Sequence, residues 1–368
     1  MTNKQEKAIL SDKDFNAILP QRTLLPEWAE QEAVVLAWPH DESDWQPWIN
    51  EARTTYVKLI KAIADAGAGV ILLCHQKDIG LAKSMIDLHL PVLIFQAEFN
   101  DTWTRDYVFL SCETARGNQP VEFVFNGWGQ KFDARKDNLV NQQLSQLCQL
   151  SLVSCDTVLE GGAIEIDQNQ ILMSTASCLF NPKRNSEHTM QDYESVFTDL
   201  LGARQCHVFQ NGHLTGDDTD GHIDTLARFT PLRGLVMQSA YNRPDDEHFT
   251  GLTALKFELE QAFSDYEIFE LPLPDMRNSD GERLPASYAN FLICNDCVLA
   301  PVYLQNEDEQ ALNTLQKAFP NHRIVAVDCS AIVQQFGSLH CITMQIPVNT
   351  LQPEVLNQMK KGVSVYDA

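Results

Sequence analysis

The densest group of polar residues that could do chemistry is HLTGDDTDGHID, from His213 to Asp224. In an extended strand alternate residues share a face, so we expect His222 and Asp224 to point the same way. A histidine among several aspartates could ligate a metal ion. Alternatively, His222 is an acid/base and Asp224 binds a substrate, or the segment is a polar loop before an ordinary strand. Because HxD is a short motif, other segments must decide.

Three other segments offer reactive side chains. Trp103 and Asp106 lie in NDTWTRD, Glu160 precedes two glycines in LEGGA, and Cys341 begins the last apolar stretch in FGSLHCIT. The glycine pair lets the backbone turn sharply and approach another group closely. Each segment also has a purely structural interpretation: Trp103 in the core, Glu160 in a solvated turn and Cys341 as a buried thiol.

Taken together, a cysteine, a histidine and three carboxylates suit attack on a guanidinium carbon. A guanidinium is a planar cation whose N–H groups two carboxylates can bind bidentately. A thiolate is a suitable nucleophile, and a histidine can protonate the departing ammonia and later activate water. Because neighbouring carboxylates disfavour a thiolate, we expect a high thiol pKa in the empty site, which the arriving cation would reverse.

A recurring unit could gather these residues, although they are far apart in the sequence. A strand–strand–helix–strand pattern returns about every 60 residues, which is the type of repeat that decides an architecture. Polar landmarks follow the same period: Asp41, Asp106, Glu160, His222, Pro285–Tyr288 and Cys341. Five such units arranged radially would bring one end of each unit to a common centre.

Apolar periodicity predicts the individual elements. The predicted strands are 34–38, 70–74, 107–112, 121–125, 163–166, 171–174, 223–229, 235–238, 289–293 and 298–302. The predicted helices are 44–66, 135–150, 190–201, one containing Leu252, Leu255, Phe257 and Leu259, and 308–318. We expect Cys294 and Cys297 to be core thiols, since a second cysteine pair at zinc-ribbon spacing is missing from the sequence.

Composition limits the partners. The 368 residues include 50 acidic and 27 basic side chains, giving a formal charge of −23, which argues against a nucleic-acid partner and favours a cationic one. The polar residues 1–21 do not resemble a signal peptide, and the longest apolar runs are too short for a membrane span. We therefore expect a cytoplasmic protein with reduced cysteines and no membrane partner. The sequence leaves the oligomeric state open, including a homo-oligomer.

Ordered motifs over about residues 25–346 carry a resemblance to a known family. They are LPEW from Leu25, AWPH from Ala37, WTRD from Trp103, FNGWG from Phe125, LEGGAIE from Leu159, LFNPKRN from Leu179, DTDGHID from Asp218, ASYANF from Ala286 and HCIT from His340. In these motifs the sequence resembles the agmatine deiminase group of the bacterial-type peptidyl-arginine deiminase family, within the guanidine-modifying superfamily.

The resemblance implies a fold, a reaction and residue roles. The fold would be a five-bladed pseudo-symmetric α/β propeller of ββαβ units, forming a single catalytic domain over 1–368 with a polar N-terminal extension of about 24 residues. Cys341 would be the nucleophile, His222 the general acid/base and Glu160 its support. Asp106 and Asp224 would clamp the guanidinium, and Trp103 would line the substrate channel. Neither a cofactor nor a metal ion is expected.

Two departures from the family pattern bear on the substrate. The segment Phe336–Leu339 reads FGSL where similar proteins carry a run of glycines before the final His-Cys, and Gln130 replaces the second glycine expected after Gly129. Agmatine, hydrolysed to N-carbamoylputrescine and ammonia, is the first choice, because it carries two positive charges. Alternatives are another guanidine or arginine-derived substrate, a metal-dependent hydrolase and a non-catalytic guanidine-binding protein. Asp217, Asp218 and Gln130 are the candidate partners of the substrate tail.

Overall fold

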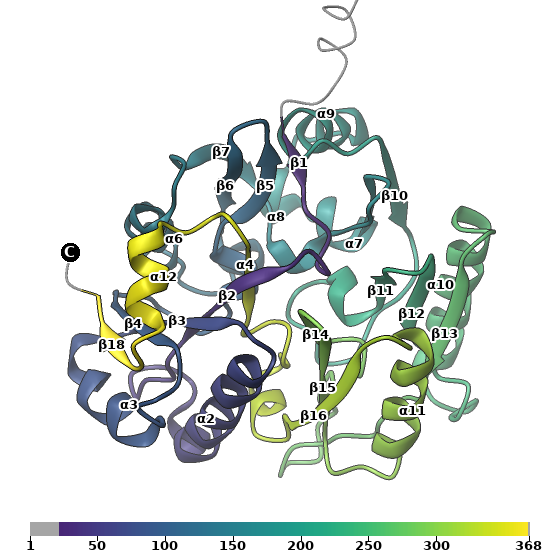
Figure 1. The fold of residues 1–368 in the computed structure, drawn as a ribbon. Helices are drawn as coiled ribbons and strands as arrows, with labels where there is room; N and C mark the ends of the chain where they lie inside the picture. The colour runs from purple at the N-terminus through teal and green to yellow at the C-terminus, as the bar shows by residue number, and fades with distance from the viewer. Residues whose placement is uncertain (1–21, 367–368) are drawn as a thin grey trace, which may run out of the picture.

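The computed structural model describes residues 22–366, which form a mixed α/β fold built from five small sheets (Figure 1). The first sheet in the chain has the order β1 (Thr23–Leu24), β5 (Leu110–Thr114), β6 (Gly117–Val124), β7 (Val153–Val158). The next three are β10 (Gln205–Phe209), β9 (Ile171–Thr175), β8 (Glu165–Ile166); β11 (Ala227–Thr230), β12 (Gly234–Gln238), β13 (Glu267–Leu271); and β14 (Leu292–Cys294), β15 (Cys297–Val302), β16 (Arg323–Asp328).

The fifth sheet joins the two ends of the described chain. Its order is β17 (Met344–Pro347), β2 (Gln31–Ala37), β3 (Gly69–Cys74), β4 (Val92–Gln96), β18 (Ser364–Val365). Here β17 pairs antiparallel with β2, and β2 pairs parallel with β3. The strand that follows Cys341 is thus fixed against the first long strand of the chain.

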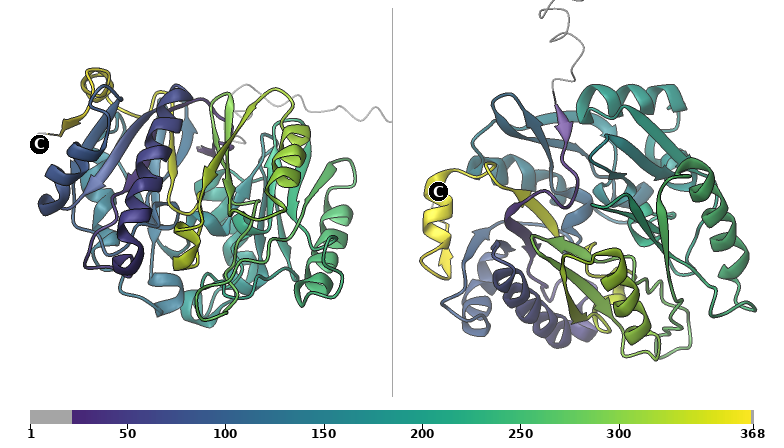
Figure 2. Two further views of the ribbon diagram at one scale, coloured as in Figure 1. Left: turned by 90° about the horizontal axis from the view of Figure 1, so that it is seen from below. Right: turned by 45° about the vertical axis from the view of Figure 1, so that its right-hand side comes forward.

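All five sheets share one internal order. Two antiparallel strands are followed by a helix that crosses to a third strand, which is parallel to the second. The crossing helices are α6 (Asp137–Leu144), α9 (Met190–Leu201), α10 (His248–Ala262), α11 (Asp308–Ala318) and α2 (Ile49–Asp65). They lie on the outside of the sheets in all three views (Figures 1 and 2).

The remaining helices are short and connect these units. They are α3 (Ile79–Met85), α4 (Thr104–Tyr107), α5 (Gly127–Gln130), α7 (Ala176–Leu179), α8 (Pro182–Asn185) and α12 (Pro353–Met359), with six 3₁₀ turns at Gln46–Trp48, Gln76–Asp78, Ser145–Leu147, Gly161–Ala163, Ile223–Thr225 and Ile332–Gln335. No helix among residues 22–366 is long and apolar enough to cross a membrane.

The connections that enter each antiparallel pair carry the polar residues singled out in the sequence. Asp106 precedes β5, Glu160 precedes β8, His222 precedes β11 and Cys341 precedes β17. Pro285–Tyr288 likewise precedes β14. Asp41 is an exception, because it follows β2, is exposed and binds Lys77 at 2.6 Å. The expected period therefore holds for five of the six landmarks, while the choice of Asp41 is wrong.

The predicted strands begin too early at four of these connections, before β5, β8, β11 and β14. Residues 104–107 form the turn α4 before β5, and Ile223–Thr225 form a 3₁₀ turn before β11. Both turns are buried, and periodicity alone does not distinguish a short buried turn from a strand. The helices predicted at 190–201 and 308–318 match α9 and α11, whereas the one predicted at 135–150 is shorter, ending as α6 and a 3₁₀ turn.

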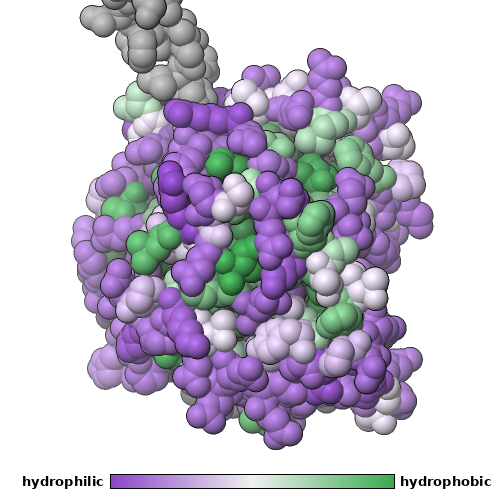
Figure 3. All heavy atoms as spheres, turned by 90° about the vertical axis from the view of Figure 1, so that its right-hand side faces the viewer, coloured by the Kyte–Doolittle hydropathy of each residue, from purple (hydrophilic) through white to green (hydrophobic). Residues whose placement is uncertain are grey.

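The core is continuous across most of the chain. Cys294 and Cys297 are buried and face each other across the β14–β15 turn, as expected of core thiols. The face in Figure 3, on the right of Figure 1, is mainly hydrophilic with scattered hydrophobic side chains. Phe257 of α10 is exposed, so this member of the predicted apolar pattern does not contribute to the core.

Gly202 gives a test of the fold, because it ends α9 with a φ of 69°. A Cβ at this position would lie 2.3 Å from the carbonyl oxygen of Arg22, next to β1. We expect Gly202→Ala to lower the free energy of unfolding by about 1–3 kcal/mol, measured by urea denaturation. Gly251→Ala is the matched control: it lies within α10 with no atom near its Cβ position, and it should gain up to about 1 kcal/mol. Equal effects would contradict this account of Gly202.

Candidate active site

Three polar side chains converge on Gly162, which lies in the turn before β8. A Cβ at residue 162 would lie 2.7 Å from Nδ1 of His222, 2.8 Å from Oδ1 of Asp106 and 3.0 Å from Oδ2 of Asp224. A side chain here would fill the space between them. The neighbouring Gly161 is equally constrained, since its Cβ would lie 2.2 Å from the Arg105 carbonyl oxygen. The glycine pair therefore serves close approach, and neither residue has a positive φ.

Asp106 is held in place by neutral donors. It lies in α4 and is almost fully buried. Its Oδ2 accepts a hydrogen bond from Nε1 of Trp128 at 2.9 Å, and its Oδ1 accepts one from the Gly162 backbone N–H at 3.0 Å. Burial, offset in part by the nearby His222, raises the pKa of Asp106 to about 6. A buried carboxylate with neutral partners remains able to bind a cation.

Asp224 lies beside the thiol of Cys341. The distance from its Oδ2 to the Cys341 Sγ is 3.9 Å, and Oδ1 of Asn290 lies 3.4 Å from the same sulfur. Among the described residues, Oδ1 of Asp224 has no hydrogen-bond partner although the residue is fully buried. Burial by itself would raise the Asp224 pKa, but the hydrogen bond and charge of His340 outweigh it and lower that pKa.

His222 lies between two acidic residues. Its Nδ1 is 3.6 Å from Oδ1 of Asp106, and its Nε2 is 3.9 Å from Oε2 of Glu160. Both ring nitrogens are buried without a hydrogen-bond partner within residues 22–366. Burial alone would lower the His222 pKa, but Asp106, Cys178 and Glu160 outweigh it and raise the pKa to about 10. The imidazole is thus protonated at neutral pH and able to act as an acid.

Glu160 is fixed by a neighbouring arginine. Nε of Arg184 donates to both oxygens of the Glu160 carboxylate, at 2.8 and 3.0 Å, and both side chains are buried. Arg184 also binds Asp220 at 2.7 Å. Arg184 therefore holds the Glu160 carboxylate in one orientation, with Oε2 on the side of His222.

Cys341 has a strongly perturbed thiol. Burial, followed by the charges of Asp224 and Asp106, raises its pKa well above the ordinary value. This direction agrees with the expectation from the sequence, although burial rather than charge is the largest cause. The free thiol is consequently protonated at neutral pH, and an arriving cation would offset both carboxylates.

A pocket of about 570 Å³, counting its open mouth, leads to Cys341 and Asp106. Four aromatic residues line it, Trp103, Trp128, Phe132 and Phe336, together with Gly337, Thr219 and Gln335. Its remaining carboxylates, which we call the rim, are Asp44, Asp101 and Asp218. Trp103 contacts Gly337 so closely that a Cβ there would lie 2.3 Å from its ring. These twelve lining residues include no lysine, arginine or histidine.

Two clusters contain ligand types that metals prefer. Donor atoms of Glu160, Cys178 and His222 lie within 4.8 Å of one another, as do those of Glu27, Glu165 and His340. An arginine already binds the carboxylates in each cluster: Arg184 binds Glu160 and Arg228 binds both Glu27 and Glu165. Because a guanidinium cation occupies those oxygens, the donor sets do not suit a further cation.

The structure brings together all six residues singled out in the sequence, but through different local geometry. His222 immediately precedes the 3₁₀ turn Ile223–Thr225, and Asp224 lies within it. Neither residue lies in a strand, contrary to the expectation from the sequence. The Asp217 carboxylate accepts hydrogen bonds from the backbone N–H groups of Thr219 and Gly221 within its own turn. Of the two acidic candidates for binding the substrate tail, Asp217 and Asp218, only Asp218 lines the pocket.

Gln130 is also a wrong choice for a tail partner. It is exposed and does not line the pocket, because the turn at α5 directs Trp128 inward instead.

Sequence reasoning missed several residues at the pocket and around it. Asp44 and Asp101 contribute to the rim, Trp128 binds Asp106, Arg184 fixes Glu160 and Asn290 contacts the sulfur. Four of these five lie in segments that were quoted for other reasons, so their residue types were visible while their roles were not. Asp44 has no local signal that distinguishes it from its acidic neighbours.

The raised thiol pKa predicts how Cys341 reacts in the free protein. Since the thiolate is the reactive form, alkylation by iodoacetamide should be slow at pH 7 and should still be rising above pH 9. Peptide mass spectrometry measures the rate at Cys341 itself, and the urea-unfolded chain supplies the reference for an ordinary thiol. A rate profile with its midpoint near pH 8.5, the value of an unperturbed thiol, would contradict the assignment.

Comparison with known proteins places this geometry in a family. Residues 23–347 match the family described as Porphyromonas-type peptidyl-arginine deiminase. A relative from Yersinia pestis, provisionally named as an agmatine deiminase, is 30% identical over 347 residues, covering 87% of this chain and 94% of the relative.

Solved structures give the same assignment. An agmatine deiminase of C. jejuni, a cysteine-to-serine variant with substrate bound, is 33% identical with a TM-score of 0.83, covering 90% of this chain and 97% of that one. The agmatine deiminase of Enterococcus faecalis shares the fold at 22% identity and a TM-score of 0.80, covering 89% and 96%. The protein therefore belongs to the Porphyromonas-type peptidyl-arginine deiminase family.

Proposed function

We propose that this protein hydrolyses the guanidine group of agmatine to N-carbamoylputrescine and ammonia. The observation that carries the proposal is the convergence of Asp106, Asp224 and His222 around Gly162, with the Cys341 thiol beside Asp224. This set is the one expected for a guanidinium substrate. The deiminase names of the relatives support the same reaction class.

Asp106 and Asp224 would hold the guanidinium as a clamp. Within the part of the chain that the structure describes, Asp224 has a free Oδ1, and Asp106 is balanced only by neutral donors and the more distant His222. Each can therefore accept N–H groups from the substrate. A guanidinium bound by two carboxylates is fixed in its plane. Its carbon would then face the sulfur of Cys341. Trp103 would line the channel for the alkyl chain.

The first half-reaction would form a covalent adduct. Binding of the cation favours transfer of the Cys341 proton to solvent water. The thiolate then attacks the guanidinium carbon, forming a C–S bond as the C=N π pair moves to nitrogen. His222, protonated in the free site, donates its proton to the leaving nitrogen. The C–N bond breaks, ammonia departs, and an amidino-cysteine remains. Glu160 would stabilise the imidazolium.

The second half-reaction would consume water. Neutral His222 takes a proton from water as its oxygen attacks the amidino carbon. The resulting intermediate expels the Cys341 thiolate, so the C–S bond breaks and a urea forms. The proton that the oxygen still carries returns to the sulfur and restores the Cys341 thiol, while the ammonia already released takes up the proton that Cys341 gave to solvent and becomes ammonium. Guanidinium and water are thereby converted to urea and ammonium without any redox step.

The pocket rim favours a second positive charge in the substrate. Asp44, Asp101 and Asp218 line the pocket, although burial raises the pKa of Asp101 to about 7. The nearby Lys131 is engaged with the Asp220 carboxylate at 2.9 Å and with the Asp218 backbone carbonyl. A terminal amine would be attracted to this rim, whereas the carboxylate of free arginine would be repelled. These charges support agmatine over arginine.

The five sheets support two proposals about architecture. We take each sheet, with its shared strand order, as one blade of a five-bladed pseudo-symmetric α/β propeller. We also propose one catalytic domain, because every blade but the fourth supplies at least one of the six residues, and Asn290 precedes the fourth blade. The proposed N-terminal extension falls mostly on residues 1–21, outside the described residues, while Thr23–Leu24 already pair with β5.

Replacement of the nucleophile separates binding from chemistry. Cys341→Ser should still bind agmatine in a calorimetric titration but should lose ammonia release by several orders of magnitude, because an alcohol is a far poorer nucleophile at neutral pH. Cys206→Ser is the control, since this half-buried thiol lies in β10 away from the pocket. Turnover near that of the wild type in Cys341→Ser would exclude the covalent mechanism.

The rim charges can be tested by substrate choice. We expect agmatine to exceed arginine at least tenfold in kcat/KM, and Asp44→Asn or Asp218→Asn to raise KM for agmatine about two- to tenfold without changing kcat. Neither variant should affect methylguanidine, which lacks the amine. Asp41→Asn is the matched control, because it removes the same charge from the loop of Asp44 outside the pocket. Equal efficiency on arginine would refute agmatine as the substrate.

A further inference from the structure

His340 is a fully buried histidine beside Cys341 that the proposed reaction does not use. Both of its ring nitrogens have close carboxylate partners: Nδ1 lies 2.7 Å from Oδ2 of Asp224, and Nε2 lies 2.7 Å from Oε1 of Glu27. The imidazole thus joins a carboxylate of the candidate site to one outside it.

The contact with Asp224 determines which way that carboxylate points. A carboxylate with both oxygens free can rotate about its Cβ–Cγ bond. Here Oδ2 is held by His340 and, at 3.3 Å, by the side-chain amide of Asn290, whereas Oδ1 has no partner in the described part of the chain. The histidine therefore fixes Oδ2 and leaves Oδ1 available to a substrate N–H.

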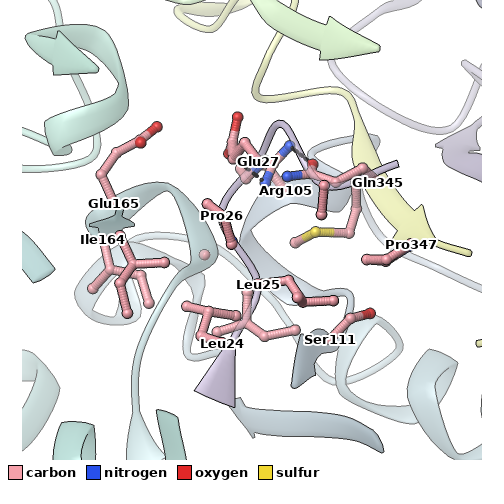
Figure 4. Close-up of a pocket in the computed structure, with 15 residues that line it drawn as sticks. Leu24, Leu25, Pro26, Glu27, Arg105, Ser111, Ile164, Glu165, Gln345 and Pro347 are labelled. Carbon is pink, nitrogen blue, oxygen red and sulfur yellow. Dashed lines mark hydrogen bonds and ion pairs between the residues drawn. The ribbon is translucent and has the colours of Figure 1, made fainter. Parts of the chain in front are cut away.

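The other side of the ring is anchored in a buried ion cluster. Glu27 binds Arg105 at 3.0 Å and also Arg228, which in turn binds Glu165. In Figure 4, Glu27 and Arg105 lie together in a second pocket, with Gln345 beside them and Glu165 across from them. Arg105 also donates its backbone N–H to the Cys341 carbonyl oxygen at 3.1 Å. The anchor is therefore tied to the segment that carries the thiol.

The ring keeps its bond to Asp224 in either protonation state. As an imidazolium it donates to Asp224 and Glu27 together. As a neutral ring with its proton on Nδ1 it still donates to Asp224, and Nε2 accepts from Nη2 of Arg228 at 3.0 Å instead of donating to Glu27. This side of the ring is then held through Arg228, which Glu27 binds. A side chain that could make only the Glu27 contact would leave Asp224 free to rotate.

We propose that His340 is a positioning residue: anchored by Glu27, it holds Asp224 in the orientation that binds and orients the guanidinium. This inference rests on the proposed function, since it assigns Asp224 to the substrate. It gives the histidine of the His-Cys pair a role separate from that of His222.

Two substitutions that each keep one half of the imidazole test the proposal. The amide nitrogen of an asparagine occupies the position of Nδ1, and that of a glutamine the position of Nε2. We expect His340→Asn to retain at least tenfold more kcat/KM on agmatine than His340→Gln, and His340→Ala to lose about ten- to a hundredfold relative to the wild type. The loss should include a rise in KM, because Asp224 contributes to binding.

A double-mutant cycle separates positioning from a general structural role. In the Asp224→Asn background, His340→Ala should cost little further activity, since its effect acts through that carboxylate. Asn118→Ala is the matched stability control: it removes a buried amide that binds Val348 and Thr350, and should lower the melting temperature without raising KM.

The outcomes distinguish the two proposals. If the wild type releases no ammonia from any guanidine, the proposed function fails. If the wild type is active but His340→Gln equals or exceeds His340→Asn, or the two losses are fully additive, the positioning role alone is overturned.

Discussion

The burial of negative charge is the constraint on which the rest of this structure depends. Glu160, Asp224 and Asp106 all lie away from solvent, where a carboxylate needs a positive or hydrogen-bonding partner. Glu160 has Arg184, and Asp224 has His340. Among residues 22–366, Asp106 has only the neutral donors Trp128 and Gly162 in direct contact, with His222 farther away, so its charge is the least compensated. A site built in this way is incomplete until a cation enters it.

The buried polar residues come from equivalent connections, one before each antiparallel strand pair. Each sheet begins its antiparallel pair just after a buried polar turn, and these turns contribute Asp106, Glu160, His222 and Cys341. The pairing of β17 with β2 brings the last turn next to the first long strand. Because Gly161 and Gly162 lack side chains, the turns can approach within hydrogen-bond distance.

Sequence reasoning predicted the repeat and the chemical groups better than their geometry. The Glu160 glycine pair and the final His-Cys pair marked real positions in the pocket region, and the helices at α9 and α11 followed from periodicity. The turn after His222 was predicted as part of a strand, because a short buried turn and a buried strand both contain apolar residues. Gln130 and Asp44 show what could not be predicted. Which side chain of a loop faces a pocket depends on the local backbone conformation, for example on the positive φ of Trp128. The residue types alone do not reveal that conformation.

The central claim is that Cys341 becomes covalently attached to the guanidinium carbon during turnover. The most direct measurement is peptide mass spectrometry of an acid-quenched reaction with agmatine that carries carbon-13 in its guanidine group. The account predicts a labelled amidino adduct on the peptide that contains Cys341, forming before ammonia release reaches its steady rate. Steady turnover with no label on any cysteine peptide, or with the label on a cysteine other than Cys341, would contradict it.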